Sequence, residues 1–269
     1  MPLAVCATPI GNLEDVTLRV LRELAEADTI LCEDTRRTRT LLARHGIDGA
    51  KLLSYHEHNE QERTRELLPR LQAGERIALV SDAGLPGISD PGSPLILAAR
   101  EAGVPVTVLP GASAVETALV TSGRSEGPYL FVGFLPRREP ERRALWEELA
   151  GVRRAAVAFE SPKRLAASLR SLAAHSPGAH VVVCRELTKL HEEIVSGGAG
   201  YVASQYADVE PRGEITLVIS GLAPPQAEES EAIAAVAELV AAGVPRKQAA
   251  ALVARLTGLS RKTLYDSGL

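Results

Sequence analysis

The stretch Leu79-Val80-Ser81-Asp82-Ala83-Gly84-Leu85-Pro86-Gly87-Ile88-Ser89-Asp90-Pro91-Gly92 constrains the architecture of this sequence more than any other segment. An apolar run at 77–80 leads into it and predicts a short buried strand, and a segment typical of a helix begins at Ser93. Gly and Pro residues between the two fix the backbone shape and expose peptide N–H groups. We call residues 81–92 the signature loop. A loop that follows a strand in this way commonly carries a functional site, and an ordinary connection rich in turn residues is the alternative.

Strands and helices alternate on both sides of the signature loop. Short apolar runs predict strands at 3–7, 29–32, 52–55 and 104–109 in the first half and at 130–134, 155–159, 181–184 and 215–220 in the second. Such alternation favours an α/β fold with a mainly parallel sheet that is covered by helices on both faces. A polar break at 122–128 predicts the boundary between two α/β domains, over 1–124 and 125–222.

The C-terminal segment differs in composition from the rest of the chain. Residues 222–229 contain two consecutive prolines and several acidic residues, which is typical of a linker. Residues 231–269 are Ala-rich and predict a helix, a turn at Gly258 and a second helix, which is the order of a helix-turn-helix. We therefore predict a small helical, RNA-binding domain over 231–269, with a purely packing role as the alternative. Its phosphate-binding candidates are Arg246, Lys247, Arg261 and Lys262.

Composition and charge argue against several classes of protein. The net charge is −4 and the isoelectric point about 5.9, which disfavours a protein that coats nucleic acid nonspecifically. Hydrophobic residues make up 45% of the chain, which is enough for sizeable cores. No apolar run approaches the roughly 18 residues of a membrane span. The N-terminus has neither a basic nor a long apolar leader, so we expect no signal peptide and a soluble, cytoplasmic protein.

Several catalytic motifs are missing from the sequence. No dinucleotide-binding G-x-G-x-x-G follows the first predicted strand, and no P-loop G-x-x-x-x-G-K-[ST] is present. Residues 111–115 look like a nucleophile elbow without its final glycine, which disfavours a hydrolase that uses Ser113 and His191. We expect no metal, because no His or Cys spacing fits a metal site. The three cysteines lie in or beside apolar runs, as expected for small buried hydrophobic residues.

Polar loops follow most of the predicted strands. Ligands of open α/β sheets bind outside the carboxyl ends of the strands, so such loops in two half-chains predict a cleft between two domains. Five of the loops carry motifs that occur together and in order: Ala7-Thr8-Pro9-Ile10-Gly11-Asn12-Leu13, the signature loop, Pro110-Gly111-Ala112-Ser113-Ala114, Gly133-Phe134-Leu135-Pro136 and Arg185-Glu186-Leu187-Thr188-Lys189-x-His191-Glu192. This set strongly resembles the tetrapyrrole methylase superfamily and, within it, the ribosomal RNA small-subunit methyltransferase I family of cytidine 2′-O-methyltransferases. The resemblance covers roughly residues 3–220.

The resemblance implies two α/β domains of the tetrapyrrole methylase type with a cofactor cleft between them, plus a small C-terminal helical domain. It implies S-adenosylmethionine as methyl donor and, as acceptor, a cytidine 2′-hydroxyl in the decoding region of small-subunit ribosomal RNA. A homodimer that acts on the small ribosomal subunit is also implied. The implied cofactor contacts, for some of which simple packing is the alternative, are Pro9, Ile10, Asp82, Ala83, Gly84, Ser113, Ala114, Leu187 and Thr216.

Methyl transfer to a ribose hydroxyl requires alignment of the acceptor oxygen with the methyl group and a base that takes the hydroxyl proton. The sequence leaves this base open. Glu186 is our first choice, followed by Glu160 and Lys189, and a surface ion pair is the alternative role of each. The remaining candidates are Glu33, Asp34, His191 and Glu192. We expect Asp90 to shape the signature loop rather than to contact a ligand.

Two further arginines, Arg36 and Arg37, lie at the start of a predicted helix and are candidates for phosphate binding. A run of charges is more often a solvated helix face, which is the alternative here. Two other functions stay open at this point. One is a methylase of the same fold that acts on a small molecule such as a tetrapyrrole, and the other is a ribosome-binding module without enzymatic activity.

Overall fold

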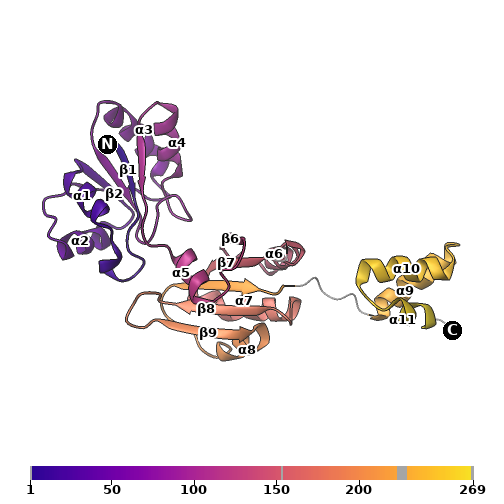
Figure 1. Cartoon of the computed structure of the whole chain (residues 1–269). Coiled ribbons are helices and arrows are strands. Elements are labelled where there is room, and N and C mark those ends of the chain that lie inside the picture. The colour runs from indigo at the N-terminus through magenta and orange to yellow at the C-terminus, as the bar shows by residue number, and fades with distance from the viewer. Residues whose placement is uncertain (1, 153, 223–228, 268–269) are drawn as a thin grey trace.

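The computed structural model describes residues 2–152, 154–222 and 229–267. Two five-stranded sheets follow one another along the chain, and a group of helices follows the second sheet (Figure 1). None of the described helices is both long enough and apolar enough to cross a membrane.

The first sheet is entirely parallel and has the strand order β3-β2-β4-β1-β5. Its strands are β1 (Leu3–Cys6), β2 (Thr29–Cys32), β3 (Leu52–Ser54), β4 (Ile77–Val80) and β5 (Val106–Leu109). Its helices are α1 (Leu18–Glu26), α2 (Thr35–Arg44), α3 (Glu60–Gln72) and α4 (Ser93–Glu101), and a short 3-10 turn, η1, spans Leu13–Asp15. Every residue of β1, β2 and β4 is buried, which explains why these strands are continuous apolar runs.

Helices cover both faces of this sheet. On one face α1 and α2 pack on side chains such as Ile30 and Val80, and on the other α3 and α4 pack on side chains such as Leu31 and Leu79. The predicted parallel sheet with two covered faces is therefore confirmed for this half of the chain.

The second sheet is mixed rather than mainly parallel. Its strands are β6 (Tyr129–Phe134), β7 (Ala155–Glu160), β8 (His180–Arg185), β9 (Glu193–Gly198) and β10 (Ile215–Ser220), in the order β6-β7-β10-β8-β9. Only β6 and β7 pair in parallel, whereas β10 runs antiparallel to both of its neighbours and β9 runs antiparallel to β8. Strand β9 was not predicted, because this edge strand is largely exposed and carries no apolar run.

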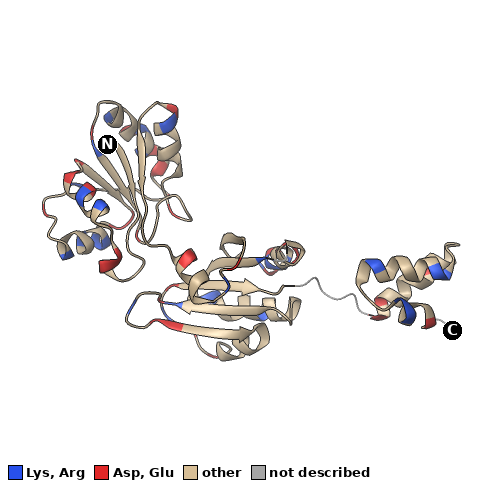
Figure 2. Ribbon diagram, in the orientation of Figure 1, with Lys and Arg blue, Asp and Glu red and all other residues tan. Residues whose placement is uncertain are grey.

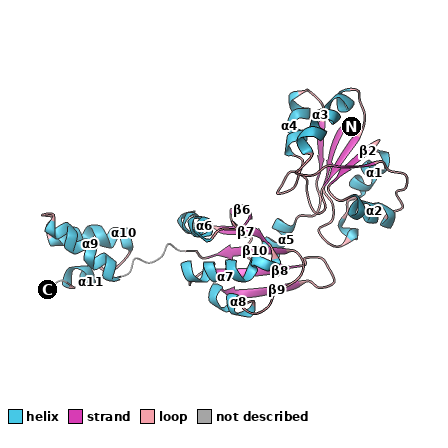
Figure 3. Cartoon of the chain, turned by 180° about the vertical axis from the view of Figure 1, so that it is seen from behind, coloured by secondary structure: helices cyan, strands magenta, loops and turns pink. Residues whose placement is uncertain are grey.

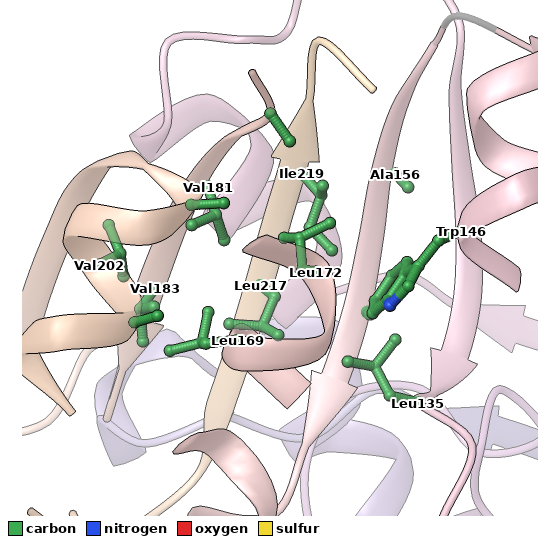
Figure 4. Close-up of a cluster of buried hydrophobic side chains, with 14 of the residues drawn as sticks. Leu135, Trp146, Ala156, Leu169, Leu172, Val181, Val183, Val202, Leu217 and Ile219 are labelled. Atoms are coloured by element: carbon green, nitrogen blue, oxygen red, sulfur yellow. The ribbon is translucent and has the colours of Figure 1, made fainter. Parts of the chain in front are cut away.

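Helices α6 (Glu139–Val152), α7 (Pro162–His175) and α8 (Ala199–Gln205) pack on one face of the second sheet. Figure 4 shows the core between them, in which Trp146 lies among aliphatic side chains such as Leu135 and Ala156. The Trp146 side chain is fully buried, and its indole Nε1 donates a hydrogen bond to Ser171 Oγ at 3.0 Å. This hydrogen bond satisfies the one polar atom of an otherwise apolar side chain.

Helix α5 (Ala114–Thr121) covers the opposite face of the second sheet. Val115, Ala118 and Leu119 pack there against Val157 and other residues of the sheet. A domain boundary at residue 124 stays a prediction, but the helix before it belongs to the core of the second sheet. The loop after β1 reaches the same core, because Ile10 is part of the cluster.

The C-terminal helices α9 (Glu229–Ala241), α10 (Arg246–Thr257) and α11 (Arg261–Asp266) lie together after the second sheet (Figure 3). They enclose a small hydrophobic core of their own. Helix α10 ends at Gly258 in the left-handed conformation, with φ of 75°, and the Ser260 hydroxyl caps the start of α11. The predicted helix, glycine turn and helix are therefore present. Most of the predicted linker lies outside the described residues.

Replacement of Trp146 by Ala is expected to lower the free energy of unfolding by about 3–5 kcal/mol, because it leaves a cavity in the largest core. The measurement is urea unfolding followed by circular dichroism. Leu190→Ala is the control, since this side chain is 92% exposed and its loss should change stability by less than about 0.5 kcal/mol. Equal stability of the two variants would contradict the assigned role of Trp146.

Candidate active site

A cavity of about 350 Å³ lies between the carboxyl ends of the first sheet's strands and the second sheet. The first half of the chain contributes residues of the signature loop and of the start of α5, and the second half contributes residues of β6, β7, β8 and β10 and their loops. We call this space the main cavity. Its volume falls in the range of cavities that hold cofactors and other small ligands.

The structure brings almost all of the predicted cofactor residues together around the main cavity. The predicted cofactor residues that line it are Ile10, Asp82, Ala83, Gly84, Ser113, Ala114, Leu187 and Thr216. Pro9 instead lines a second cavity that adjoins the first. Ile10, Leu187 and Thr216 are also tightly packed, with exposed fractions of 6%, 6% and 5%. For these three residues, packing and ligand contact are therefore compatible roles.

Backbone hydrogen bonds hold the signature loop against the end of β1. Thr8 N donates to Gly84 O at 2.8 Å, Gly84 N donates to Thr8 O at 3.1 Å, and the Thr8 hydroxyl donates to Ser81 O at 3.0 Å. Gly84 has a φ of 77°, a conformation that glycine adopts without strain. These bonds fix the loop backbone at the wall of the main cavity.

Asp82 is held at this wall by contacts with the neighbouring strand end. Its Oδ1 accepts a hydrogen bond from Asp34 N at 3.0 Å, and its Oδ2 lies 3.7 Å from Arg37 Nε. The carboxylate is thus oriented by the backbone and keeps capacity to accept from a ligand, because each of its oxygens can accept more than one hydrogen bond.

The loop after β8 packs against the loop after β1 beside the two cavities. Asn12 N donates to Thr188 Oγ1 at 3.0 Å. Gly11 fits tightly here, since a β-carbon at this position would lie 2.5 Å from Lys189 Cγ and 2.8 Å from Leu187 O. Glu186 and Thr188 both adopt positive φ, 53° and 65°, which non-glycine residues do only when the surroundings hold them there.

Two of the predicted base candidates in this loop form an ion pair. Glu186 Oε1 accepts from Lys189 Nζ at 2.8 Å and from Glu214 N at 2.9 Å. Burial raises the pKa of Glu186, but these contacts outweigh it and leave the pKa below its ordinary value. Burial likewise lowers the pKa of Lys189, and the charges and hydrogen bonds of Glu186 and Glu214 outweigh it and raise the pKa. Each group therefore stays charged, which leaves Lys189 unable to accept a proton.

The third candidate, Glu160, is anchored even more firmly. Its side chain is fully buried, and Oε1 lies 2.6 Å from Arg164 NH2 and accepts from Ser161 N at 2.6 Å. Its Oε2 accepts from the Ser168 hydroxyl at 2.5 Å. Glu160 lines the main cavity, but its oxygens are already engaged by the start of α7. The catalytic roles of Glu160, Glu186 and Lys189 stay predictions, and the geometry favours structural roles for them.

Asp90 lines the main cavity, although the sequence indicated only a loop-shaping role for it. Among the described residues, no Lys, Arg or His side chain forms an ion pair with it. Burial, followed by the negative charge of Glu33, raises the pKa of Asp90 to about 6, although a hydrogen bond from Ser81 lowers it. An Asp before Pro91-Gly92 is typical of a turn, so nothing in the sequence indicates that this carboxylate lines a cavity.

The predicted RNA-binding residues lie in two separate places. Arg36 and Arg37 are exposed on α2, and of the two only Arg37 lines the main cavity and the second cavity. The other four lie on α10 and α11, and Lys247, Arg261 and Lys262 are exposed. Figure 2 shows Lys and Arg positions of these C-terminal helices in blue. Arg246 Nε donates to Tyr265 O at 3.0 Å, which joins the start of α10 to α11. All three cysteines are buried, as predicted.

Comparison with known proteins identifies the family of this chain. The model of the tetrapyrrole (corrin/porphyrin) methylases matches residues 2–203, and the model of the RsmI C-terminal HTH domain matches residues 226–269. The ribosomal RNA small subunit methyltransferase I of Synechocystis is 41% identical over 99% of this chain and 97% of its own length. The chain belongs to the ribosomal RNA small subunit methyltransferase I family. The family resemblance predicted from the loop motifs is thereby confirmed.

Other members and the solved structures agree with this family. The Mycobacterium tuberculosis (strain H37Rv) protein of the same name is 45% identical over 99% of this chain and 94% of its own length. The methyltransferase CobJ has a TM-score of 0.62 with 21% identity, over 83% of this chain and 94% of its own. A uroporphyrin-III C-methyl transferase from Thermus thermophilus, complexed with S-adenosyl homocysteine, has a TM-score of 0.56 and 21% identity, over 82% and 97% of the two chains. At these identities the two structures show a shared fold.

Replacement of Glu160 by Ala is expected to lower the free energy of unfolding by about 3–5 kcal/mol, because it leaves the partly buried Arg164 without its partner. Chemical denaturation measures the change. Glu214→Ala removes an exposed carboxylate from two ion pairs and serves as the control, with an expected loss below about 1 kcal/mol. A Glu160→Ala variant with unchanged stability would exclude the structural role and favour a role in binding or catalysis.

Proposed function

We propose that this protein transfers a methyl group from S-adenosylmethionine to the 2′-hydroxyl of a cytidine in the decoding region of small-subunit ribosomal RNA. The observation that carries the proposal is the main cavity, which gathers the signature loop and the motif loops of both sheets at one place. The relatives that match the chain over almost its full length carry the name of a small-subunit RNA methyltransferase, which supports the substrate class.

The main cavity fits S-adenosylmethionine in its chemistry. Ile10, Leu187 and Phe159 offer apolar contacts for an adenine ring, and Asp82 offers carboxylate oxygens for an amine or for ribose hydroxyls. When bound there, the cofactor supplies a methyl group on a sulfonium, which is a good leaving group. The chain's own task is then to orient the cofactor, to exclude water and to receive one proton.

We propose that Asp90 is the base that accepts this proton. A ribose hydroxyl is a weak nucleophile, and the bond from its oxygen to the methyl carbon forms as the carbon–sulfur bond breaks and the hydroxyl proton moves to a base. Asp90 is the cavity carboxylate that no described cation neutralises, whereas Asp82, Glu160 and Glu214 each face an arginine. The negative charges of Asp82 and Glu214 also help to raise the pKa of Asp90, which requires these groups to lie near one another.

The partner and the assembly are part of this proposal. The basic residues of α10 and α11 support contact with the small ribosomal subunit, because phosphate groups attract exposed Lys and Arg side chains. A homodimer and a cytoplasmic location are proposed from the family resemblance alone.

The direct test of the function uses radiolabelled S-adenosylmethionine with small ribosomal subunits that lack the modification. We expect transfer of label to the ribose of one cytidine, located by primer extension or mass spectrometry. Free ribosomal RNA and tetrapyrrole precursors are the comparison substrates. Transfer to a tetrapyrrole but not to subunits would favour the small-molecule methylase instead, and cofactor binding without any transfer would favour a binding module.

Replacement of Asp82 by Ala is expected to weaken binding of S-adenosylmethionine by about 10- to 100-fold, because a hydrogen bond to a charged group is lost. Isothermal titration calorimetry measures the dissociation constant. Asp48→Ala is the matched control, since Asp48 is an exposed aspartate on the connection between α2 and β3. An unchanged affinity would remove Asp82 from the cofactor site.

Replacement of Asp90 by Asn is expected to lower kcat/KM for small subunits by about 10²–10⁴-fold, with little change in cofactor affinity. The carboxylate accepts a proton only when ionised, so the wild-type rate should fall as the pH drops through about 6, the raised pKa of Asp90. The Asn variant should lose this acidic limb of the pH–rate profile. A wild-type rate and profile in the variant would exclude Asp90 as the base.

A further inference from the structure

A second cavity of about 240 Å³ adjoins the main cavity. Residues of the loop after β1, of α2 and of the start of the signature loop form most of its wall, together with Lys189 and Glu214 from the second half of the chain. The two cavities share part of their wall, and the shared residues are Ile10, Arg37, Asp82, Ala83 and Glu214. A molecule in the second cavity would therefore lie directly beside a ligand in the main cavity. We call this space the side cavity.

Two cations lie at the side cavity, and they are held very differently. Lys189 Nζ lies 2.8 Å from Glu186 Oε1 and 3.1 Å from Glu214 Oε2, so it is fixed by two short ion pairs. Arg37 Nε lies 3.7 Å from Asp82 and its NH1 lies 3.8 Å from Glu214, and its side chain is 57% exposed. Ion pairs that are this long and this exposed contribute little to stability, so Arg37 can exchange its partners at small cost.

The partner that suits such a guanidinium is a phosphate group. The planar N–H fork of arginine matches phosphate oxygens in a bidentate geometry, and the resulting hydrogen bonds are stronger than neutral ones. The remaining wall of the side cavity combines apolar side chains, including Pro9 and Leu13, with the hydroxyls of Thr8 and Thr40. A sugar and a base, which have apolar faces and polar edges, fit this mixture.

We propose that the side cavity is the subsite of the acceptor nucleotide, in which Arg37 binds a phosphodiester of the RNA strand. This places the acceptor's ribose at the wall that the two cavities share, next to the bound methyl donor. The inference rests on the proposed function, because it names where the acceptor of that reaction binds. It also separates two residues that the sequence treated alike, since only Arg37 lines the side cavity.

Arg36 lies next to Arg37 on the same turn of α2, but it has a different partner. Its Nε and NH2 bind the two oxygens of Asp34 at 3.1 and 2.8 Å, and its side chain is 86% exposed. The hydrogen bonds and charge of Arg36 hold the pKa of Asp34 at about 2, well below its usual range. Arg36 thus has a local partner and lines neither of the two cavities, so its loss should matter less for an RNA strand that passes Arg37.

The first experiment measures binding of a fluorescein-labelled oligocytidylate, rC5, to the full chain saturated with S-adenosylhomocysteine, by anisotropy at several salt concentrations. Each phosphate contact on a single strand contributes about 0.7 to the slope of log affinity against log salt concentration. Arg37→Ala should lower this slope by about that amount, and Arg36→Ala should lower it less. Arg65→Ala removes an exposed charge from α3, on the opposite face of the first sheet, and should leave the slope unchanged.

The second experiment measures methyl transfer to small subunits at saturating cofactor. Arg37→Ala should lower kcat/KM for the subunit by about tenfold or more, while the dissociation constant for S-adenosylmethionine stays within about threefold of wild type. Arg37→Lys should recover part of the loss, because it restores the charge without the fork.

Equal salt slopes for the Arg37, Arg36 and Arg65 variants would overturn the proposal, as would a loss of cofactor affinity in Arg37→Ala that matches its loss of kcat/KM. The binding experiment requires no turnover, so it tests whether the side cavity binds an RNA strand even if the wild-type protein methylates no RNA. In that case the proposed function fails, and an Arg37-specific change in slope still identifies the side cavity as a binding site for a nucleotide strand.

Discussion

The contact between the loop after β1 and the loop after β8 is the constraint on which the rest of the site depends. Gly11 lies so close to Leu187, Thr188 and Lys189 that no larger residue fits without a shift of the backbone. Two residues at positive φ, Glu186 and Thr188, shape the second loop at this position. Gly11 and Lys189, which meet at this contact, also line the side cavity, and the side cavity adjoins the main cavity.

The charged side chains of the site differ in whether they have a close counterion. Glu160 and Glu186 are neutralised by Arg164 and Lys189, so they hold backbone segments in place. Asp90 keeps no such partner among the described residues, and Arg37 has only distant ones. In the proposed reaction, the proton and the phosphate are therefore assigned to the two groups that have no close counterion.

The sequence predicted the elements of this fold better than the roles of its charged residues. The strands of the first sheet were found because residues such as those of Ile77–Val80 are buried on both faces and form continuous apolar runs. Strand β9 was missed because an exposed edge strand has no such run. The environment of Glu186 could not be read from its motif, since it accepts a hydrogen bond from Glu214, 28 positions away. Side-chain partners of this kind follow from tertiary packing alone.

The same loop contact also has a consequence for synthesis of the chain. Asn12 and Thr188 are separated by 176 positions, so the loop after β1 is made long before the loop that it contacts. At about 5–20 residues per second, that interval lasts roughly 10–35 s. During this time the first sheet can already fold, because its contacts are local to its own half. A nascent chain therefore carries an open, incomplete cavity until β8, the loop after it and β10 have left the ribosome that translates it.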